Sequence, residues 1–127
     1  MAYIYANPNP KHKLTNDCVI RAISLATRRP WNEVFWDLTL EAFDMKESCL
    51  DNNAVWGSYL ERRGFSKHHI SDSCPMCYTL RQFCEDNSKG VFVVGTGTHA
   101  VAVIDGDFYD IFDSSSVIPL YYFFVEE

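Results

Sequence analysis

The chain has 127 residues, of which 47% are hydrophobic and 15% aromatic, and this is enough apolar material for one folded domain with a sizeable core. The formal net charge of −6 gives no basic surface for nucleic acid or anionic lipid, so we expect neither as a partner. No stretch approaches the roughly 18 consecutive apolar residues of a membrane span.

The N-terminus and the cysteines indicate a reducing compartment. Residues 1–8 lack the basic segment and the long apolar run of a signal peptide. The cysteine count is odd, and without a secretion signal we expect the thiols to stay reduced in the cytoplasm. No motif calls for a cofactor, and we expect none. The five cysteines are Cys18, Cys49, Cys74, Cys77 and Cys84.

Apolar residues recur at helical spacing in the first two thirds of the chain. Pro30 is favoured at the first position of a helix, so a new helix is expected to begin there. Thr79 and Gln82 have the spacing of a capping box, which predicts another helix start. The expected helices cover residues 18–27, 30–45, 53–63 and 80–87, and Asn53 is expected to cap the third.

The hydrophobic period changes from helix to strand after residue 90. Residues 65–70 are ambiguous and could add a strand. Helices followed by strands predict an α+β fold, with N-terminal helices packed on a C-terminal antiparallel sheet of about four strands. No linker interrupts the chain, so residues 1–127 are expected to form a single domain. The expected strands cover residues 91–94, 99–104, 108–113 and 119–125.

The first functional candidate is a cysteine at a helix start. Asn16 and Asp17 both favour the N-cap position, and the apolar run that follows predicts a buried helix. A thiol in the first turn of such a helix lies near the positive end of the helix dipole, which favours the thiolate. Because the thiolate is the nucleophilic form, Cys18 is a candidate for covalent catalysis.

A histidine and an aspartate on a predicted hairpin could complete a catalytic site. His99 opens one strand, and a strong turn signal follows at residues 105–106. A three-residue loop puts His99 directly opposite Asp113, whereas a two-residue loop puts Phe112 there and turns Asp113 to the other face. The three-residue register also pairs apolar residues along one face, so we favour it and expect Asp113 to orient His99. Asp110 is the alternative third member.

Each of these residues also has an ordinary explanation. A cysteine at a helix start is more often a small core residue, and a histidine at a strand end is more often a satisfied polar residue. Asp113 before three serines is typical of a loop start. The order of the three residues along the chain and their local settings together favour catalysis.

The order cysteine, histidine, aspartate resembles that of the papain-like cysteine peptidase superfamily, especially its compact bacterial and phage members such as the bacteriocin-processing peptidases. The resemblance implies a papain-like domain that hydrolyses peptide or protein substrates, with Cys18 as the nucleophile and His99 as the general base and acid. It also implies that Asp113 orients His99. The matching segments are residues 17–18, 98–106 and 109–114.

The chain departs from this family just before the cysteine. Many papain-like enzymes carry a glutamine there as a donor to the oxyanion, but His12 stands at the corresponding position. The backbone N–H of Cys18 can still donate, because N–H groups in the first turn of a helix are unpaired. We expect the side chain of Asn16 to be the second donor, with His12 as the alternative.

A second resemblance concerns residues 18–22. Their Cys-x-x-Arg-Ala pattern is similar to the catalytic helix of ovarian-tumour-type deubiquitinases. The chain is short for that family, and Ala100 stands where its members carry an aromatic residue. Arg21 also has a structural explanation, as a helix arginine paired with a carboxylate.

Other features leave alternatives open. Cys74 and Cys77 form one C-x-x-C motif, which with Cys84 could bind zinc, although a structural zinc site needs four ligands. The aromatic segment 121–124 could be a closing core strand or an oligomer interface. A non-catalytic binding module on the same fold is the alternative to the hydrolase. The tryptophans are expected in the core or in cleft walls: Trp31, Trp36 and Trp56.

Overall fold

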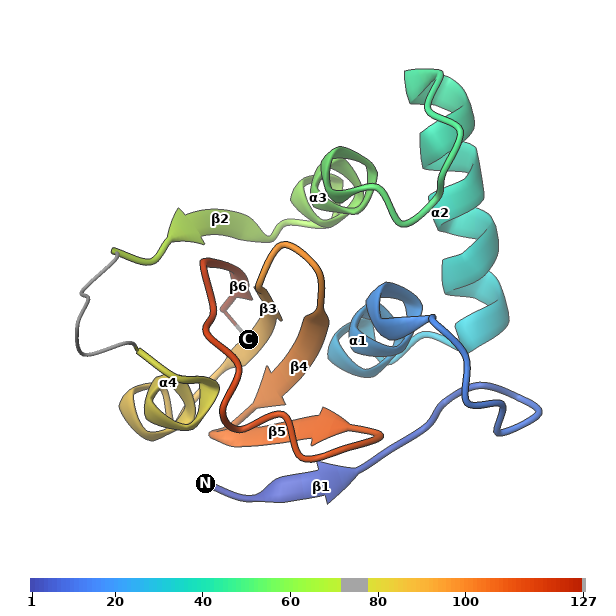
Figure 1. Cartoon of the computed structure of the whole chain (residues 1–127). Coiled ribbons are helices and arrows are strands. Elements are labelled where there is room, and N and C mark those ends of the chain that lie inside the picture. The colour runs from blue at the N-terminus through green and yellow to red at the C-terminus, as the bar shows by residue number, and fades with distance from the viewer. Residues whose placement is uncertain (72–77, 127) are drawn as a thin grey trace.

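The computed structural model describes residues 1–71 and 78–126, which form an α+β fold (Figure 1). The first helix has the predicted bounds, and the fourth begins with the predicted capping box of Thr79 and Gln82. The helices are α1 (Cys18–Thr27), α2 (Trp31–Met45), α3 (Asn53–Arg62) and α4 (Leu80–Asp86). The strands are β1 (Tyr3–Tyr5), β2 (Ser66–His69), β3 (Val91–Gly95), β4 (Ala100–Ile104), β5 (Asp107–Asp110) and β6 (Tyr121–Val125).

The strands form one mixed six-stranded sheet in the order β1-β5-β4-β3-β6-β2. β1 pairs with β5 in parallel, and the other neighbours are antiparallel. The expected antiparallel sheet of about four strands is therefore wrong in size and in one pairing. Both added strands are short edge strands. β1 has three residues, and the side chains of β2 are all exposed, so neither shows the alternation that identifies a strand in sequence.

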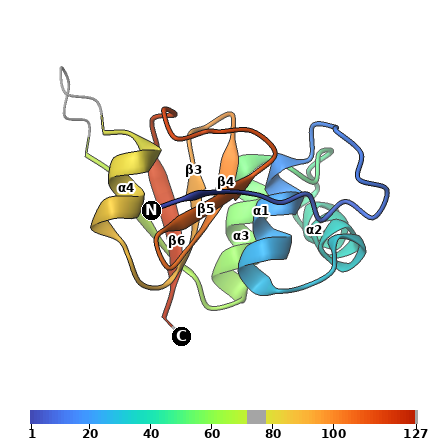
Figure 2. The same ribbon diagram turned by 90° about the horizontal axis from the view of Figure 1, so that it is seen from below.

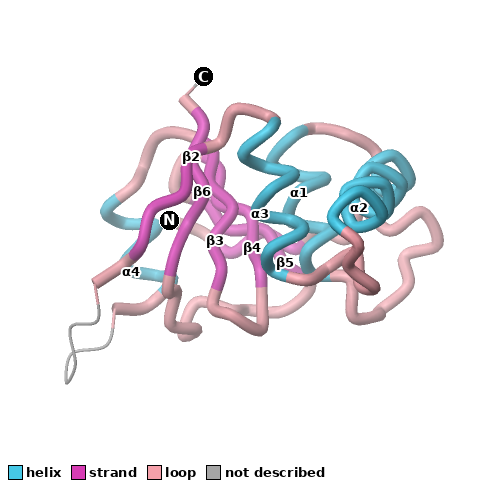
Figure 3. The backbone as a smooth tube through the Cα atoms, turned by 90° about the horizontal axis from the view of Figure 1, so that it is seen from above, coloured by secondary structure: helices cyan, strands magenta, loops and turns pink. Residues whose placement is uncertain are grey.

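Helices cover both faces of this sheet (Figure 2). On one face α1 and α3 pack against β3, β4 and β6, with α2 outside them, and Figure 3 shows these three helices gathered on one side. On the other face α4 packs against β3, β4 and β5. β3 is consequently buried along its whole length. None of the described helices is long and apolar enough to cross a membrane.

The aromatic strand β6 lies inside the sheet, between β3 and β2. Phe123 packs on Trp56 of α3 with ring centroids 5.2 Å apart, and Tyr122 packs on Phe83 of α4 at 5.1 Å. Both edges of the strand are paired inside the sheet, Phe123 is buried, and its other four residues are half-buried. The aromatic run therefore belongs to a core strand, and the oligomer contact through β6 stays a prediction.

The β4–β5 hairpin has a two-residue turn, because Ile104 pairs with Asp107. The turn residues Asp105 and Gly106 have φ angles of 51° and 83°, as in the type I′ turns that match strand twist. Asp105 is also held from outside the hairpin: its N–H donates to the carbonyl of Gly90, and its Oδ1 accepts from the N–H of Gly90 at 3.0 Å. The expected three-residue loop is therefore wrong. Each residue of β4 consequently pairs with the β5 residue that comes one position earlier in the chain than expected.

Candidate active site

Cys18 is the first residue of α1 and a half-buried free thiol. Asp17 occupies the N-cap position but makes no capping hydrogen bond with its side chain, contrary to expectation. The thiol therefore lies at a helix start whose backbone N–H groups donate no hydrogen bond to the side chain of Asp17. This is the position at which the helix dipole favours a negative sulphur.

The pKa of Cys18 is lower than that of an ordinary cysteine thiol. Burial raises it, but hydrogen bonds from the His99 side chain and the Ala100 backbone outweigh burial, with the positive charges of His99 and Arg21 adding to their effect. Cys84, which is buried, behaves in the opposite way: burial raises its pKa to about 11, and the charges of Asp107 and Glu85 add to this against the N-terminal ammonium. Of these two thiols, only Cys18 is prepared to be a thiolate.

His99 lies in the β3–β4 turn, one residue before β4. Thr96 fixes its backbone, since Thr96 Oγ1 accepts from the N–H of His99 at 3.0 Å. Nε2 of His99 is 2.7 Å from Oδ2 of Asp110, which leaves Nδ1 as the nitrogen free to interact with the Cys18 thiol. Burial lowers the pKa of His99, but the hydrogen bonds to Asp110 and Cys18 and their negative charges raise it to about 9. The imidazole is therefore protonated at neutral pH.

Asp110, and not Asp113, holds His99. Asp113 is exposed and accepts from the N–H of Ser115. The two-residue turn explains the difference: it places His99 and Asp110 diagonally on one face of the hairpin and turns Asp113 to the other. Phe112 confirms this register, with its ring 5.2 Å from that of His99.

The carboxylate of Asp110 is 2% exposed and uses both oxygens. Besides His99, it accepts from Ser114 Oγ at 2.8 Å and from the N–H of Ile111 at 2.8 Å. Burial raises its pKa, but the hydrogen bonds from His99 and Ser114, the His99 charge and the Ile111 N–H together lower it. Asp110 therefore stays ionised and cannot rotate away from His99.

Arg21 is the buried cation of this cluster, as its structural explanation predicts. Its guanidinium pairs with Asp17 one turn earlier on α1 and with Asp110 at 3.3 Å. Asp17 in turn accepts from Trp31 Nε1 at 2.9 Å and from Asn9 Nδ2 at 3.3 Å. The side chain of Asp17 is thus engaged inside the protein, which is why it does not cap α1.

Cys18 and His99 line a small pocket of about 100 Å³ between the starts of α1 and α3 and the β3–β4 turn. Asn53 Nδ2 donates to the carbonyl of Gly97 at 3.2 Å and ties α3 to this turn. The predicted cap of α3 is therefore off by one residue: Asn52 caps it by accepting from the N–H of Ala54. The pocket is lined by Asn16, Cys18, Val19, Asp51, Asn53, Trp56, Gly97, Thr98, His99 and Ala100.

The two expected oxyanion donors lie in different places. Asn16 is exposed and lines the pocket beside Cys18. His12 is in a turn with a φ of 51°, where its N–H donates to the carbonyl of Asn9, and it does not line the pocket. The position of Asn16 therefore fits a second donor better than that of His12.

The zinc alternative is not assembled by the part of the chain that the structure describes. Within it, no three histidine, cysteine, aspartate or glutamate side chains are grouped to hold a metal ion. Cys74 and Cys77 lie outside the described residues, and Cys84 is buried in α4.

Comparisons with protein-family models, with curated proteins and with solved structures give no match for this chain. The site itself combines a thiol of lowered pKa, an imidazole of raised pKa and a buried carboxylate at the edge of a pocket. This combination can form a nucleophile and deliver a proton to a leaving group.

Proposed function

We propose that the protein is a papain-like thiol hydrolase, most simply a cysteine peptidase, with Cys18 as the nucleophile, His99 as the general acid and base, and Asp110 as the residue that orients His99. One observation carries the proposal: His99 is hydrogen-bonded to a buried carboxylate, that of Asp110, and shares a pocket with a thiol at a helix start whose pKa it lowers. A structural cysteine needs neither partner.

The chemistry follows from the two protonation states. The Cys18 thiolate attacks the carbonyl carbon of an amide, a carbon–sulphur bond forms, and the carbonyl oxygen becomes an oxyanion. His99 gives its Nδ1 proton to the leaving nitrogen as the carbon–nitrogen bond breaks, which leaves an acylated Cys18. His99 then takes a proton from water, whose oxygen attacks the acyl carbon. The carbon–sulphur bond breaks, and the products are a carboxylic acid and the regenerated ion pair.

The oxyanion is placed against the start of α1. The backbone N–H of Cys18 is in the first helical turn, where such groups have no partner within the helix. The side chain of Asn16 is the second donor in this proposal, because it lines the same pocket. Asp110 takes no proton: its low pKa keeps it a carboxylate that stabilises the imidazolium.

The direct test is a peptide-library digestion analysed by mass spectrometry. We expect the unaltered chain to cleave a subset of peptides and the Cys18→Ala variant to cleave none. Leu40→Ala is the control, because it removes an exposed side chain outside the triad and its pocket and should retain full activity. Equal cleavage by the Cys18→Ala variant would exclude the proposed nucleophile.

The second candidate function is protein binding without catalysis. It is favoured by a stripe on the outer side of α2, where Trp36, Leu40 and Phe43 are each at least 60% exposed. A binding module of this kind does not depend on the hydrogen bond between Cys18 and His99. Two results together would support this function over the hydrolase. Cys18 would be unreactive, and a protein partner that binds the unaltered chain would fail to bind the Trp36→Ser variant.

A further inference from the structure

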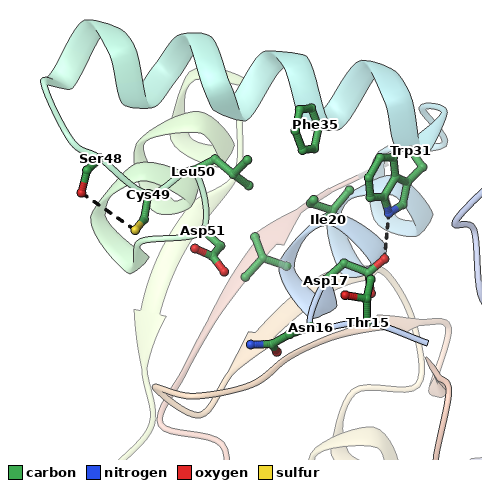
Figure 4. A pocket seen from close by; sticks show the side chains of 11 residues that line it. Thr15, Asn16, Asp17, Ile20, Trp31, Phe35, Ser48, Cys49, Leu50 and Asp51 are labelled. Carbon is green, nitrogen blue, oxygen red and sulfur yellow. Dashed lines mark hydrogen bonds between the residues drawn. The ribbon is translucent and has the colours of Figure 1, made fainter. Parts of the chain in front are cut away.

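A larger pocket of about 460 Å³, shown in Figure 4, shares lining residues with the pocket that holds Cys18. Asn16, Val19 and Asp51 line both, so the two pockets lie next to each other at the start of α1. The volume is within the range of sites that bind small ligands or several side-chain groups. A peptide substrate bound at Cys18 is therefore one that could place a neighbouring side chain in the larger pocket.

The walls of the larger pocket are apolar and rigid. Ile20 of α1 faces Trp31 and Phe35 of α2, and Leu50 of the α2–α3 connection closes one side (Figure 4). The rings of Trp31 and Phe35 stack with centroids 5.4 Å apart. Trp31 is also fixed by its hydrogen bond to Asp17. The pocket is consequently preformed and costs little ordering when an apolar group enters it.

The rim of the pocket is polar and carries no compensating cation. Asp51 is exposed at the boundary between the two pockets. Among the described residues, no lysine, arginine or histidine lines the larger pocket. An acidic substrate group placed here would meet a like charge and lose water without gaining a partner.

We propose that this pocket is the specificity site for the substrate: it binds a large apolar side chain, such as leucine or phenylalanine, close to the bond that Cys18 attacks, and Asp51 excludes acidic residues from that position. This inference rests on the proposed hydrolase, whose site supplies the reacting end of the same peptide. It goes further by assigning the substrate class to peptides with an apolar anchor.

The three tryptophans allow a binding test that needs no turnover. Trp31 lines the larger pocket, Trp56 lines the pocket of Cys18, and Trp36 is exposed on the outer side of α2. Their indole N–H signals can be followed by NMR in the Cys18→Ala variant during titration with capped pentapeptide amides. The peptides carry leucine, phenylalanine, glycine or glutamate between alanines.

We expect the leucine and phenylalanine peptides to shift the Trp31 signal at concentrations about tenfold lower than the glycine peptide, because a large apolar side chain leaves water. The glutamate peptide should bind no better than the glycine peptide. Equal binding of leucine and glycine peptides, or a shift confined to Trp36, would overturn the inference.

A matched pair of leucine variants tests the same inference in the active chain. Leu50→Ala removes a wall of the pocket, whereas Leu40→Ala removes an exposed leucine on the outer side of α2. We expect Leu50→Ala to lower kcat/KM for the leucine peptide about tenfold relative to the glycine peptide and Leu40→Ala to leave this ratio unchanged. Equal ratios in the two variants would contradict the inference.

Thermal melts and the iodoacetamide reactivity of Cys18 serve as controls, since both should be retained in the two leucine variants. These readouts also separate the two proposals. If Cys18 is unreactive and no peptide is cleaved, the hydrolase fails, while the NMR titration still decides whether the pocket binds apolar side chains. If peptides are cleaved without regard to apolar residues, the hydrolase stands and the specificity site fails.

Discussion

Arg21 donates from its guanidinium to Oδ1 of Asp110 at 3.3 Å, and so one side chain of α1 holds the carboxylate that holds His99. Cys18 lies one turn earlier on the same helix. The proposed nucleophile and the residue that supports its proposed base are therefore positioned by a single element. The two positive charges, on Arg21 and protonated His99, lie beside the two buried negative charges of Asp17 and Asp110.

Removal of the Arg21 charge should destabilise the protein strongly. Arg21→Met leaves two buried carboxylates without their shared cation, and we expect the free energy of unfolding to fall by about 3–5 kcal/mol. Urea denaturation measures this loss. Arg81→Met is the control, because it breaks an exposed pair with Glu85 and should cost about 0–1 kcal/mol. Similar losses in both variants would mean that the buried pairs contribute little.

Two aspartates on the same segment separate the proposed orienting residue from its neighbour. Asp110→Asn removes the charge that raises the pKa of His99, so this pKa should fall, the pKa of Cys18 should rise, and peptide hydrolysis should slow by about a hundredfold or more. Asp113→Asn alters an exposed carboxylate that does not contact His99, and its activity should equal that of the unaltered chain. The reverse ranking would restore Asp113 as the orienting residue.

The reactive ion pair should exist only within a limited pH range. At low pH, Cys18 is protonated, but because its pKa is lowered, the rate should rise at a pH below the ordinary thiol value of 9.0. At high pH, His99 loses its proton near its pKa of about 9, and the leaving group then receives no proton. A profile of kcat/KM against pH should therefore be bell-shaped with a falling limb near pH 9. A rate that keeps rising through pH 10 would contradict the role of His99 as acid.

Asn16 can be tested as the second oxyanion donor. Asn16→Ala should lower kcat by about a hundredfold to a thousandfold. The reaction of Cys18 with iodoacetamide should be unchanged, since that reaction forms no oxyanion. His12→Ala provides the comparison, because His12 lies outside the pocket and should have no effect. A loss in His12→Ala with none in Asn16→Ala would reverse the assignment of the donor.

Local signals in the sequence predicted the helices well. The bounds of α1 and the capping box of α4 depend on caps, prolines and apolar spacing, which act within a few residues. Trp36 shows the limit of such signals. It was expected in the core or in a cleft wall, but it is 63% exposed, because it lies between the buried positions Val34 and Leu38 and therefore on the opposite side of α2.

The interactions that decide the site come from distant parts of the chain. Gly90 fixes Asp105 in the two-residue turn, and this contact selects Asp110 over Asp113. The local signal for this register is the type I′ preference of the Asp-Gly pair, which favours a two-residue turn and with it Asp110. The pairing of Arg21 with Asp110 joins α1 to β5 and has no local signal at all.

Competitive alkylation shows whether His99 lowers the pKa of the Cys18 thiol, on which the proposed nucleophile depends. Iodoacetamide labelling followed by peptide mass spectrometry gives the rates of Cys18 and of the exposed Cys49 in one sample across a series of pH values. If exposure alone set the rate of alkylation, Cys49 would react faster than Cys18. We predict that Cys18 nevertheless reacts faster at about pH 6 to 7, with a midpoint below 9.0, because His99 stabilises its thiolate. If the Cys18 rate rises only near pH 9 and never exceeds that of Cys49, His99 does not activate the Cys18 thiol.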